Sequence, residues 1–144
     1  MKLEWLLWLA SLLPQPLADH TCLATTVYLE ARSEPTLGQK AVAEVAMRRL
    51  QTGRWGDSVC AVVNAKAQFA PSIVSKDYVI KNPKAWRKAW SIAGNALKNW
   101  SLPEQEREHI VPEADHFYAQ NLVAPAWGGR TVAVIGGHSF IDVN

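Results

Sequence analysis

A proline interrupts the helical pattern of this chain directly after two closely spaced carboxylates. Apolar residues recur at helical spacing over Leu23–Ala31, which predicts a helix with one buried face. Glu34 stands immediately before Pro35, and a residue in that position is disfavoured in helical geometry. We therefore expect the first helix of the domain to run from about His20 to Arg32, with Glu30 on its last turn.

A second helix is expected directly after this break. Thr36 is a candidate N-cap, and Gln39 follows three residues later as its capping-box partner. The helix should end near Leu50, because Thr52 and Gly53 come next. Its expected apolar side consists of Leu37, Ala41, Val42, Val45 and Ala46.

The remainder of the chain predicts one more long helix and then short strands. Asn82 is a candidate N-cap for a helix with Pro83 at its first position. Segments 116–118, 131–135 and 139–141 are strand-like, and the glycines at 136 and 137 predict a hairpin between the last two. The expected buried face of the helix carries Trp86, Trp90, Ala93 and Leu97. The predicted class is α+β, predominantly helical, with a small C-terminal hairpin or sheet.

Residues 1–19 are expected to form an export signal or signal anchor, ahead of one domain over residues 20–144. The apolar run from Trp5 to Leu13 is shorter than the roughly 20 residues of a bilayer-spanning helix, but it fits the core of a secretory signal. Pro14 and Pro16 should break any helix there. We expect export to the periplasm or cell wall, with cleavage of the segment or transient membrane association through it. The alternative is a soluble protein with an apolar N-terminal helix.

The two cysteines agree with export. In an exported chain of this size, Cys22 and Cys60 favour a single disulfide. The alternative is a pair of buried thiols in a cytosolic protein. Two cysteines alone cannot form a structural zinc site, so metal binding would need histidines as well.

Composition narrows the function classes. Of the 144 residues 49% are hydrophobic and 19% charged, which predicts one globular domain with a real core. The net charge is only +2 and no basic cluster exceeds pairs such as Arg48 and Arg49, so a nucleic-acid binder is not expected. The seven tryptophans favour a protein that binds carbohydrate, since indole faces stack on sugar rings. Trp86 and Trp90 are more simply explained as packing residues.

Eight short segments occur in an order that is more specific than any one of them. They are Cys22–Ala24, Tyr28–Pro35, Gly38–Val45, Val59–Val63, Gln68–Phe69, His116–Tyr118, Pro125–Trp127 and Ile135–Phe140. Together they resemble the cell wall hydrolase family of the spore-cortex-lytic enzymes, which also occurs in bacteriophage lysis proteins. The resemblance covers about residues 21 to 141. Ser33 and Arg48 depart from it, since the family usually has Gly and Asn there.

The resemblance implies a lysozyme-like fold and an enzyme that degrades peptidoglycan. Members act as lytic transglycosylases on the bond between N-acetylmuramic acid and N-acetylglucosamine and leave 1,6-anhydro ends. The glutamate before Ala31 and Arg32 is their catalytic acid, which is Glu30 here. No metal or other cofactor is expected. An export segment followed by a single domain resembles a phage endolysin for host cell lysis more than a spore enzyme, and we expect a monomer.

A catalytic acid must stay protonated near neutral pH, which calls for an apolar or aromatic pocket. The candidate walls and substrate contacts are Tyr28, Gln68, Phe69, Tyr118, Trp127 and His138. For Tyr118 and His138 a purely structural role is an equal or better explanation.

Glu34 is a candidate second carboxylate, four residues after Glu30. Lysozyme-type hydrolysis would need it, at about 6.5–9.5 Å from the acid in an inverting enzyme or about 5–5.5 Å in a retaining one. The alternative is a structural carboxylate that binds Arg32 or the free amides at the start of the second helix.

Two other function classes stay open. A zinc amidase or peptidase could use His109, His116 or His138 with a carboxylate, although the chain has no His-Glu-x-x-His spacing. A non-catalytic domain that binds peptidoglycan is the other alternative.

Overall fold

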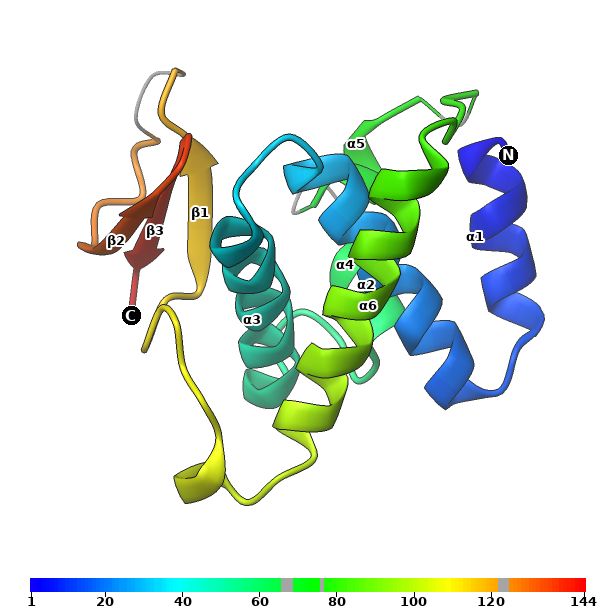
Figure 1. Ribbon diagram of the computed structural model, residues 1–144. Helices are drawn as coiled ribbons and strands as arrows, with labels where there is room; N and C mark the ends of the chain where they lie inside the picture. The colour runs from blue at the N-terminus through cyan, green and yellow to red at the C-terminus, as the bar shows by residue number, and fades with distance from the viewer. Residues whose placement is uncertain (66–68, 76, 122–124) are drawn as a thin grey trace.

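The computed structural model describes residues 1–65, 69–75, 77–121 and 125–144. Helices fill most of it, and a small sheet lies at one end beside α3, with α1 at the opposite end (Figure 1). The helices are α1 Leu3–Leu12, α2 Gln15–Ala31, α3 Thr36–Thr52, α4 Val59–Asn64, α5 Ala70–Ile73 and α6 Pro83–Trp100, with a 3-10 turn at Glu104–Glu106. The strands are β1 His116–Ala119, β2 Arg130–Ile135 and β3 His138–Asp142.

Helix α2 begins five residues before its expected start. Pro14 is its N-cap, and Pro16 lies in its first turn, where a proline costs no hydrogen bond because the amide there has no partner in the helix. The predicted break after the apolar run is confirmed at Pro14, between α1 and α2, but Pro16 lies inside α2 and does not break it. The helix also crosses residue 19, so the 1–19 segment holds α1 and the beginning of α2.

The break between α2 and α3 occurs at the predicted proline but without the predicted capping box. Thr36 is the first residue of α3, and the N-cap, Pro35, has no side chain that can accept a hydrogen bond. Gln39 instead donates through Nε2 to the carbonyl oxygen of Glu34 at 3.1 Å. Gly53, with φ of 74°, ends the helix in the left-handed conformation that glycine adopts readily.

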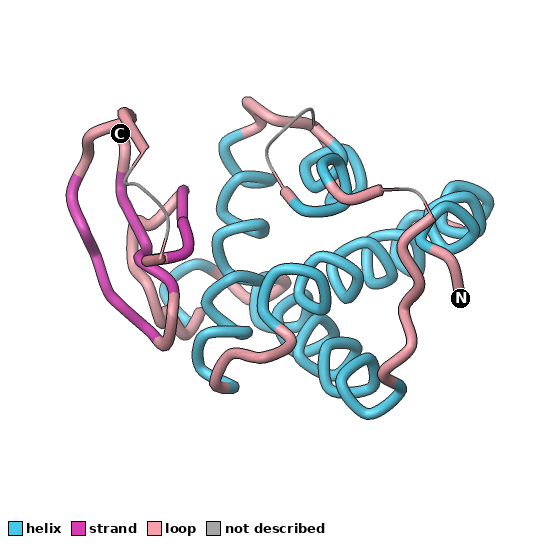
Figure 2. The backbone as a smooth tube through the Cα atoms, turned by 90° about the horizontal axis from the view of Figure 1, so that it is seen from above, coloured by secondary structure: helices cyan, strands magenta, loops and turns pink. Residues whose placement is uncertain are grey.

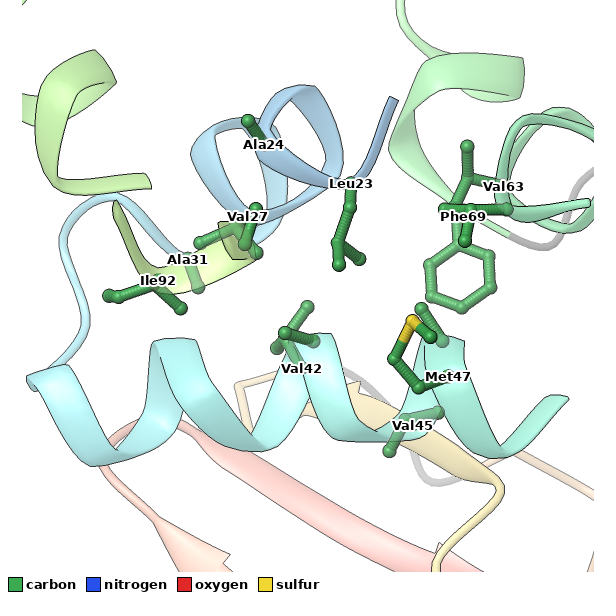
Figure 3. Close-up of a cluster of buried hydrophobic side chains, with 14 of the residues drawn as sticks. Leu23, Ala24, Val27, Ala31, Val42, Val45, Met47, Val63, Phe69 and Ile92 are labelled. Carbon is green, nitrogen blue, oxygen red and sulfur yellow. The ribbon is translucent and has the colours of Figure 1, made fainter. Parts of the chain in front are cut away.

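The core forms where α3, α4, α6 and α1 pack around α2. The helices gather on one side of the molecule and the strands on the other (Figure 2). Leu23, Val27 and Ala31 project from α2 towards α3, as their spacing predicted (Figure 3). Leu37 was expected on the buried side of α3 and is 51% exposed instead. The other members of the expected α3 stripe, Ala41, Val42, Val45 and Ala46, are buried.

Helix α6 has the predicted cap and a slightly shifted buried face. The side chain of Asn82 accepts a hydrogen bond from the amide of Ala85 at 3.0 Å. The fully buried residues are Ala89, Ile92 and Ala93, while Trp86, Trp90 and Leu97 are half-buried along the margins. Small residues at the centre let α6 approach α2 closely.

The predicted hairpin is confirmed and belongs to a three-stranded antiparallel sheet of order β1-β3-β2. Phe117 of β1 pairs with Phe140 of β3. Of the three strands only β3 is almost wholly buried, because it lies in the middle of the sheet. The sheet forms one wall of the molecule against α3 (Figure 1).

Helix α1 packs on α2 through one face. Leu3 and Ala10 are buried, and the Leu3 amide donates to the carbonyl of Tyr78 at 2.8 Å. The opposite face is apolar and exposed: Trp5 is 57% exposed and Trp8 is 61% exposed. No helix in the described part of the chain is long and apolar enough to cross a membrane.

The predicted disulfide is confirmed. Cys22 in α2 is bonded to Cys60 in α4, across a sequence separation of 38 residues. The bond ties the helix that carries Glu30 to the short helix beneath it. On the chain-entropy view it stabilises the fold by about 3–4 kcal/mol.

Candidate active site

Glu30 lies on the last turn of α2, where the helix meets the start of α5. Its Oε1 accepts a hydrogen bond from the backbone amide of Ala70 at 2.7 Å. Burial raises the pKa of the Glu30 carboxyl, and the Ala70 amide and the positive charge of Arg49 offset part of that rise. A carboxyl group in this setting can be held protonated at a higher pH than an exposed glutamate, as a general acid requires.

The positive charge of Arg49 acts on the Glu30 carboxyl. Arg49 was not among the site residues expected from the sequence. Its guanidinium carbon lies 4.6 Å from the ring centre of Trp55 and 4.8 Å from that of Phe69. Its Nε donates to the carbonyl of Asp115 at 2.7 Å. Burial lowers the pKa of Arg49 to about 10, so it remains a cation at neutral pH. Its position four residues after Val45, on the apolar stripe of α3, was the signal that it points inwards.

Glu34 binds the tip of the β2–β3 hairpin. Its Oε2 accepts a hydrogen bond from the amide of Gly137 at 3.0 Å, and its Oε1 lies 3.5 Å from Nδ1 of His138. As a structural carboxylate, Glu34 was expected to bind Arg32 or the first amides of α3. Both expected partners were wrong. Arg32 instead donates to the hydroxyl of Tyr78.

The turn that carries Glu34 forms without a left-handed residue at Ser33. Glu113 is the one non-glycine residue with positive φ among the residues described. The Glu34 amide closes the turn by donating to the carbonyl of Ala31 at 2.9 Å. Serine in place of the family's glycine therefore needs no strained backbone here.

Two of the expected wall residues lie in the core. Tyr28 is 1% exposed, and its hydroxyl accepts from the Asn82 amide at 3.3 Å. Phe69 is also 1% exposed and packs behind the Glu30 site against Phe117, with ring centres 5.9 Å apart. Both support the site from within and offer no surface to a polymer in this conformation, which corrects their expected place on the walls. Gln68 lies outside the described residues.

The other candidates surround the sheet side of the site. Trp127 is 45% exposed, and Tyr118 is half-buried with its ring centre 6.4 Å from that of Trp127. His138 is 6% exposed and packs edge-on against Phe117. Burial lowers the pKa of His138, and the Glu34 carboxylate offsets part of that effect. Trp127 and Tyr118 thus leave aromatic surface open to solvent, whereas His138 belongs to the Glu34 contact.

The described residues contain no group of three histidine, cysteine, aspartate or glutamate side chains that could hold a metal ion. A hollow between α3 and α6, lined by Glu44, Ile92 and Trp100 among others, does not include Glu30. The site offers one half-buried acid, Glu30, one buried cation, Arg49, and an aromatic margin. That set can protonate a leaving oxygen and then accept a proton at the same carboxylate.

Comparison with known proteins shows the family of this chain. The family model described as Cell Wall Hydrolase matches residues 33–141, which begin just after Glu30. The spore cortex-lytic enzyme of Bacillus subtilis is 30% identical over 125 residues, covering 86% of this chain and 37% of that protein. The corresponding enzyme of Oceanobacillus iheyensis is 36% identical over 86 residues, covering 55% of this chain and 31% of that protein. The chain thus spans about a third of the length of these curated relatives.

Two solved structures are similar to this chain in fold. The catalytic domain of a germination-specific lytic transglycosylase, SleB, from Bacillus anthracis superposes with a TM-score of 0.66 at 23% identity, covering 85% of this chain and 93% of that one. The catalytic domain of SleB from Bacillus cereus gives 0.63 at 25% identity, covering 85% and 88%. The predicted α+β, lysozyme-like fold is therefore confirmed.

Proposed function

This chain belongs to the cell wall hydrolase family, and we propose that it cleaves peptidoglycan glycan strands as a lytic transglycosylase with Glu30 as its single catalytic acid. The bond cleaved is the one between N-acetylmuramic acid and N-acetylglucosamine. The observation that carries the proposal is the setting of Glu30: a half-buried carboxyl of raised pKa on the last turn of α2, which accepts a hydrogen bond from the backbone amide of Ala70.

The reaction needs only one carboxyl group. Protonated Glu30 gives its proton to the glycosidic oxygen as the bond from that oxygen to C1 of the muramic acid breaks. The carboxylate that results takes the proton of the C6 hydroxyl on the same sugar, and O6 closes on C1 to form the 1,6-anhydro ring. Burial favours the acid in the first step, and the positive charge of Arg49 stabilises the carboxylate between the two steps.

Lysozyme-type hydrolysis with Glu34 as a second carboxylate is the alternative. A general base or nucleophile must be free to approach water or C1. Both oxygens of Glu34 already face the hairpin, one on the Gly137 amide and the other near His138. These contacts favour the single-acid reaction over the hydrolytic one.

The setting of the reaction forms part of the proposal. We place residues 1–19 as an export signal or signal anchor and residues 20–144 as the catalytic domain of an exported monomer that acts in the cell envelope, as a phage endolysin does. The exposed apolar face of α1, with Trp5 and Trp8, supports transient contact with a membrane surface.

Mass spectrometry of the products from purified sacculi tests the reaction. Muropeptides that end in 1,6-anhydro-N-acetylmuramic acid are expected. Reducing-end products, heavier by one water, would replace the proposal with hydrolysis. Release of free stem peptides that stops on addition of EDTA would point instead to a zinc amidase. Sacculi that are bound but release nothing soluble would leave a binding domain.

A further inference from the structure

Three aromatic side chains from separate segments meet next to the buried Arg49. Trp55 follows α3, His116 begins β1, and Trp127 stands in the turn before β2. The ring centre of His116 lies 6.0 Å from that of Trp55 and 4.7 Å from that of Trp127. Trp127 is 45% exposed, and the His116 side chain is 13% exposed. The group therefore reaches the surface at Trp127 and His116.

This aromatic group is connected to the catalytic acid through direct contacts. Trp55 has the guanidinium groups of both Arg49 and Arg54 over its ring, each 4.6 Å from the ring centre. Arg49 also lies over Phe69, whose neighbour Ala70 donates to Glu30. With its ring occupied by two arginines, Trp55 acts as a support. Trp127 and His116 are the members that can face a ligand.

A buried carboxylate fixes the orientation of the His116 ring. Asp115 Oδ1 lies 3.0 Å from His116 Nδ1 and accepts from the Val143 amide at 2.9 Å. Burial opposes ionisation of Asp115, but the bonds from His116 and Val143 outweigh it and hold its pKa below the ordinary value. An ionised carboxylate only accepts, so Nδ1 of His116 carries a proton towards Asp115 and Nε2 is left to form a hydrogen bond with a ligand.

The turn that carries Trp127 is fixed by the same C-terminal residues. Gly128 and Gly129 both have positive φ, of 72° and 88°. A Cβ on Gly129 would lie 2.5 Å from the carbonyl oxygen of Asp142 and 3.0 Å from Cα of Val143. The backbone can approach this closely only because residue 129 is glycine. Val143 therefore lies against both the Trp127 turn and the Asp115–His116 pair, and sets the two groups in fixed relation.

We infer that His116 and Trp127 form a sugar-binding subsite for the glycan strand, with Asp115 as the residue that positions His116. The exposed indole of Trp127 offers a flat apolar surface to the C–H face of a pyranose ring, and His116 Nε2 forms a hydrogen bond with a sugar hydroxyl. The inference rests on the proposed function, because it assigns the ligand as the strand that Glu30 cleaves.

The test separates binding from cleavage. The full chain carrying Glu30→Gln is titrated with peptide-free glycan strands, prepared from sacculi with an amidase, and binding is followed by calorimetry. In this background Trp127→Ala and His116→Phe should each raise the dissociation constant about tenfold, a typical effect of losing one aromatic or polar contact. Trp127→Phe keeps a ring at the surface and should bind within about threefold of the parent.

Trp8→Ala in α1 serves as the matched control, since Trp8 is 61% exposed and belongs to none of these contacts. It should bind like the parent. Thermal melting of every variant establishes that the fold is intact. With Glu30 restored, Trp127→Ala should raise KM about tenfold and change kcat less than about threefold, since a subsite that holds the strand equally in ground and transition states contributes uniform binding.

Parent-like affinity of both Trp127→Ala and His116→Phe for peptide-free strands would overturn the subsite. So would variants that lose binding to intact sacculi only, because the surface would then read the stem peptide. If wild-type protein released no muropeptides while the two variants still lost affinity, the proposed cleavage would fail and the subsite would stand.

Discussion

Glu30 and Glu34 are four residues apart in the sequence, yet the fold gives them different surroundings. Glu30 lies on the last turn of α2 and accepts a hydrogen bond from the amide of Ala70, the first residue of α5. Glu34 lies in the next turn and reaches the sheet, where it meets Gly137 and His138. The pKa of Glu30 is raised by burial, whereas both oxygens of Glu34 face the hairpin.

The difference teaches that position relative to the helix break decides the role. A residue on the last turn of α2 is held by a rigid helix and directed towards α5, inside the protein. A residue past the break is free to turn outwards and bridge to another element. Identical side chains thus separate into an acid and a tie between the helices and the sheet, because their environments differ.

The largest expected effect follows from removing the acid. Glu30→Gln keeps the size of the side chain and an oxygen that can accept from Ala70, but it cannot donate the catalytic proton. We expect the rate of muropeptide release to fall by about 10³-fold or more, in line with the loss of a general acid. The measurement is release of soluble fragments from sacculi.

Glu34→Gln is the matched control for that variant. The amide oxygen of glutamine can still accept from Gly137, so activity should stay within a few-fold of wild type. If Glu34→Gln lost as much activity as Glu30→Gln, the contrast between the two carboxylates would collapse and the two-carboxylate hydrolase would be favoured.

The second prediction concerns stability. Glu34→Ala removes the acceptor for the Gly137 amide and leaves Nδ1 of His138 buried without a neighbour, since that atom has no hydrogen-bond partner within the described residues. We expect a loss of about 1–2 kcal/mol in the free energy of unfolding, measured with denaturant. Glu34→Gln should recover most of it. Equal losses in both variants would show that charge, not the hydrogen bond, holds the hairpin.

The parts of the fold that depend on local chemistry could be predicted from the sequence. The proline break at residue 35, the Asn82 cap and the glycine hairpin each follow from residues next to one another. The disulfide followed from cysteine number and the expectation of export. These elements need no knowledge of what lies across the molecule.

The parts that depend on distant contacts could not be predicted. The partner of Glu34 is 103 residues away in sequence, so no local pattern pointed to Gly137. The site prediction likewise placed Tyr28 and Phe69 on the walls, because an aromatic residue reads the same whether it lines a groove or packs behind it. Arg49 could have been predicted from its position on the apolar stripe of α3. It was overlooked because arginine is rarely buried, and Arg49 is.

The third prediction concerns the effect of Arg49 on the pKa of Glu30. The positive charge of Arg49 favours the carboxylate and so lowers the pKa of Glu30. Arg49→Met removes that charge, so the pKa should rise and the protonated acid should persist to higher pH. The alkaline limb of the kcat/KM profile should move upwards by up to about one pH unit. Arg49→Lys keeps the charge and should leave the limb in place. A downward shift in Arg49→Met would contradict the assignment of Glu30 as the acid.

The smallest expected effect probes the contact of Glu34 from the hairpin side. A Cβ on Gly137 would lie 2.8 Å from Glu34 Oε1, and the three nearest atoms around it all belong to Glu34. Gly137 lies outside the positive-φ region, so alanine brings no backbone strain there.

Gly137→Ala should therefore destabilise wild type by up to about 1 kcal/mol, because the carboxylate must move. In the Glu34→Ala background the same change should stabilise by a few tenths of a kcal/mol, roughly the entropic benefit of replacing a glycine. The double-mutant cycle, measured by denaturant unfolding, should thus give a coupling of about 1 kcal/mol between the two residues. Simple additivity would mean that the hairpin is held by its own strands and that Glu34 is free to act elsewhere.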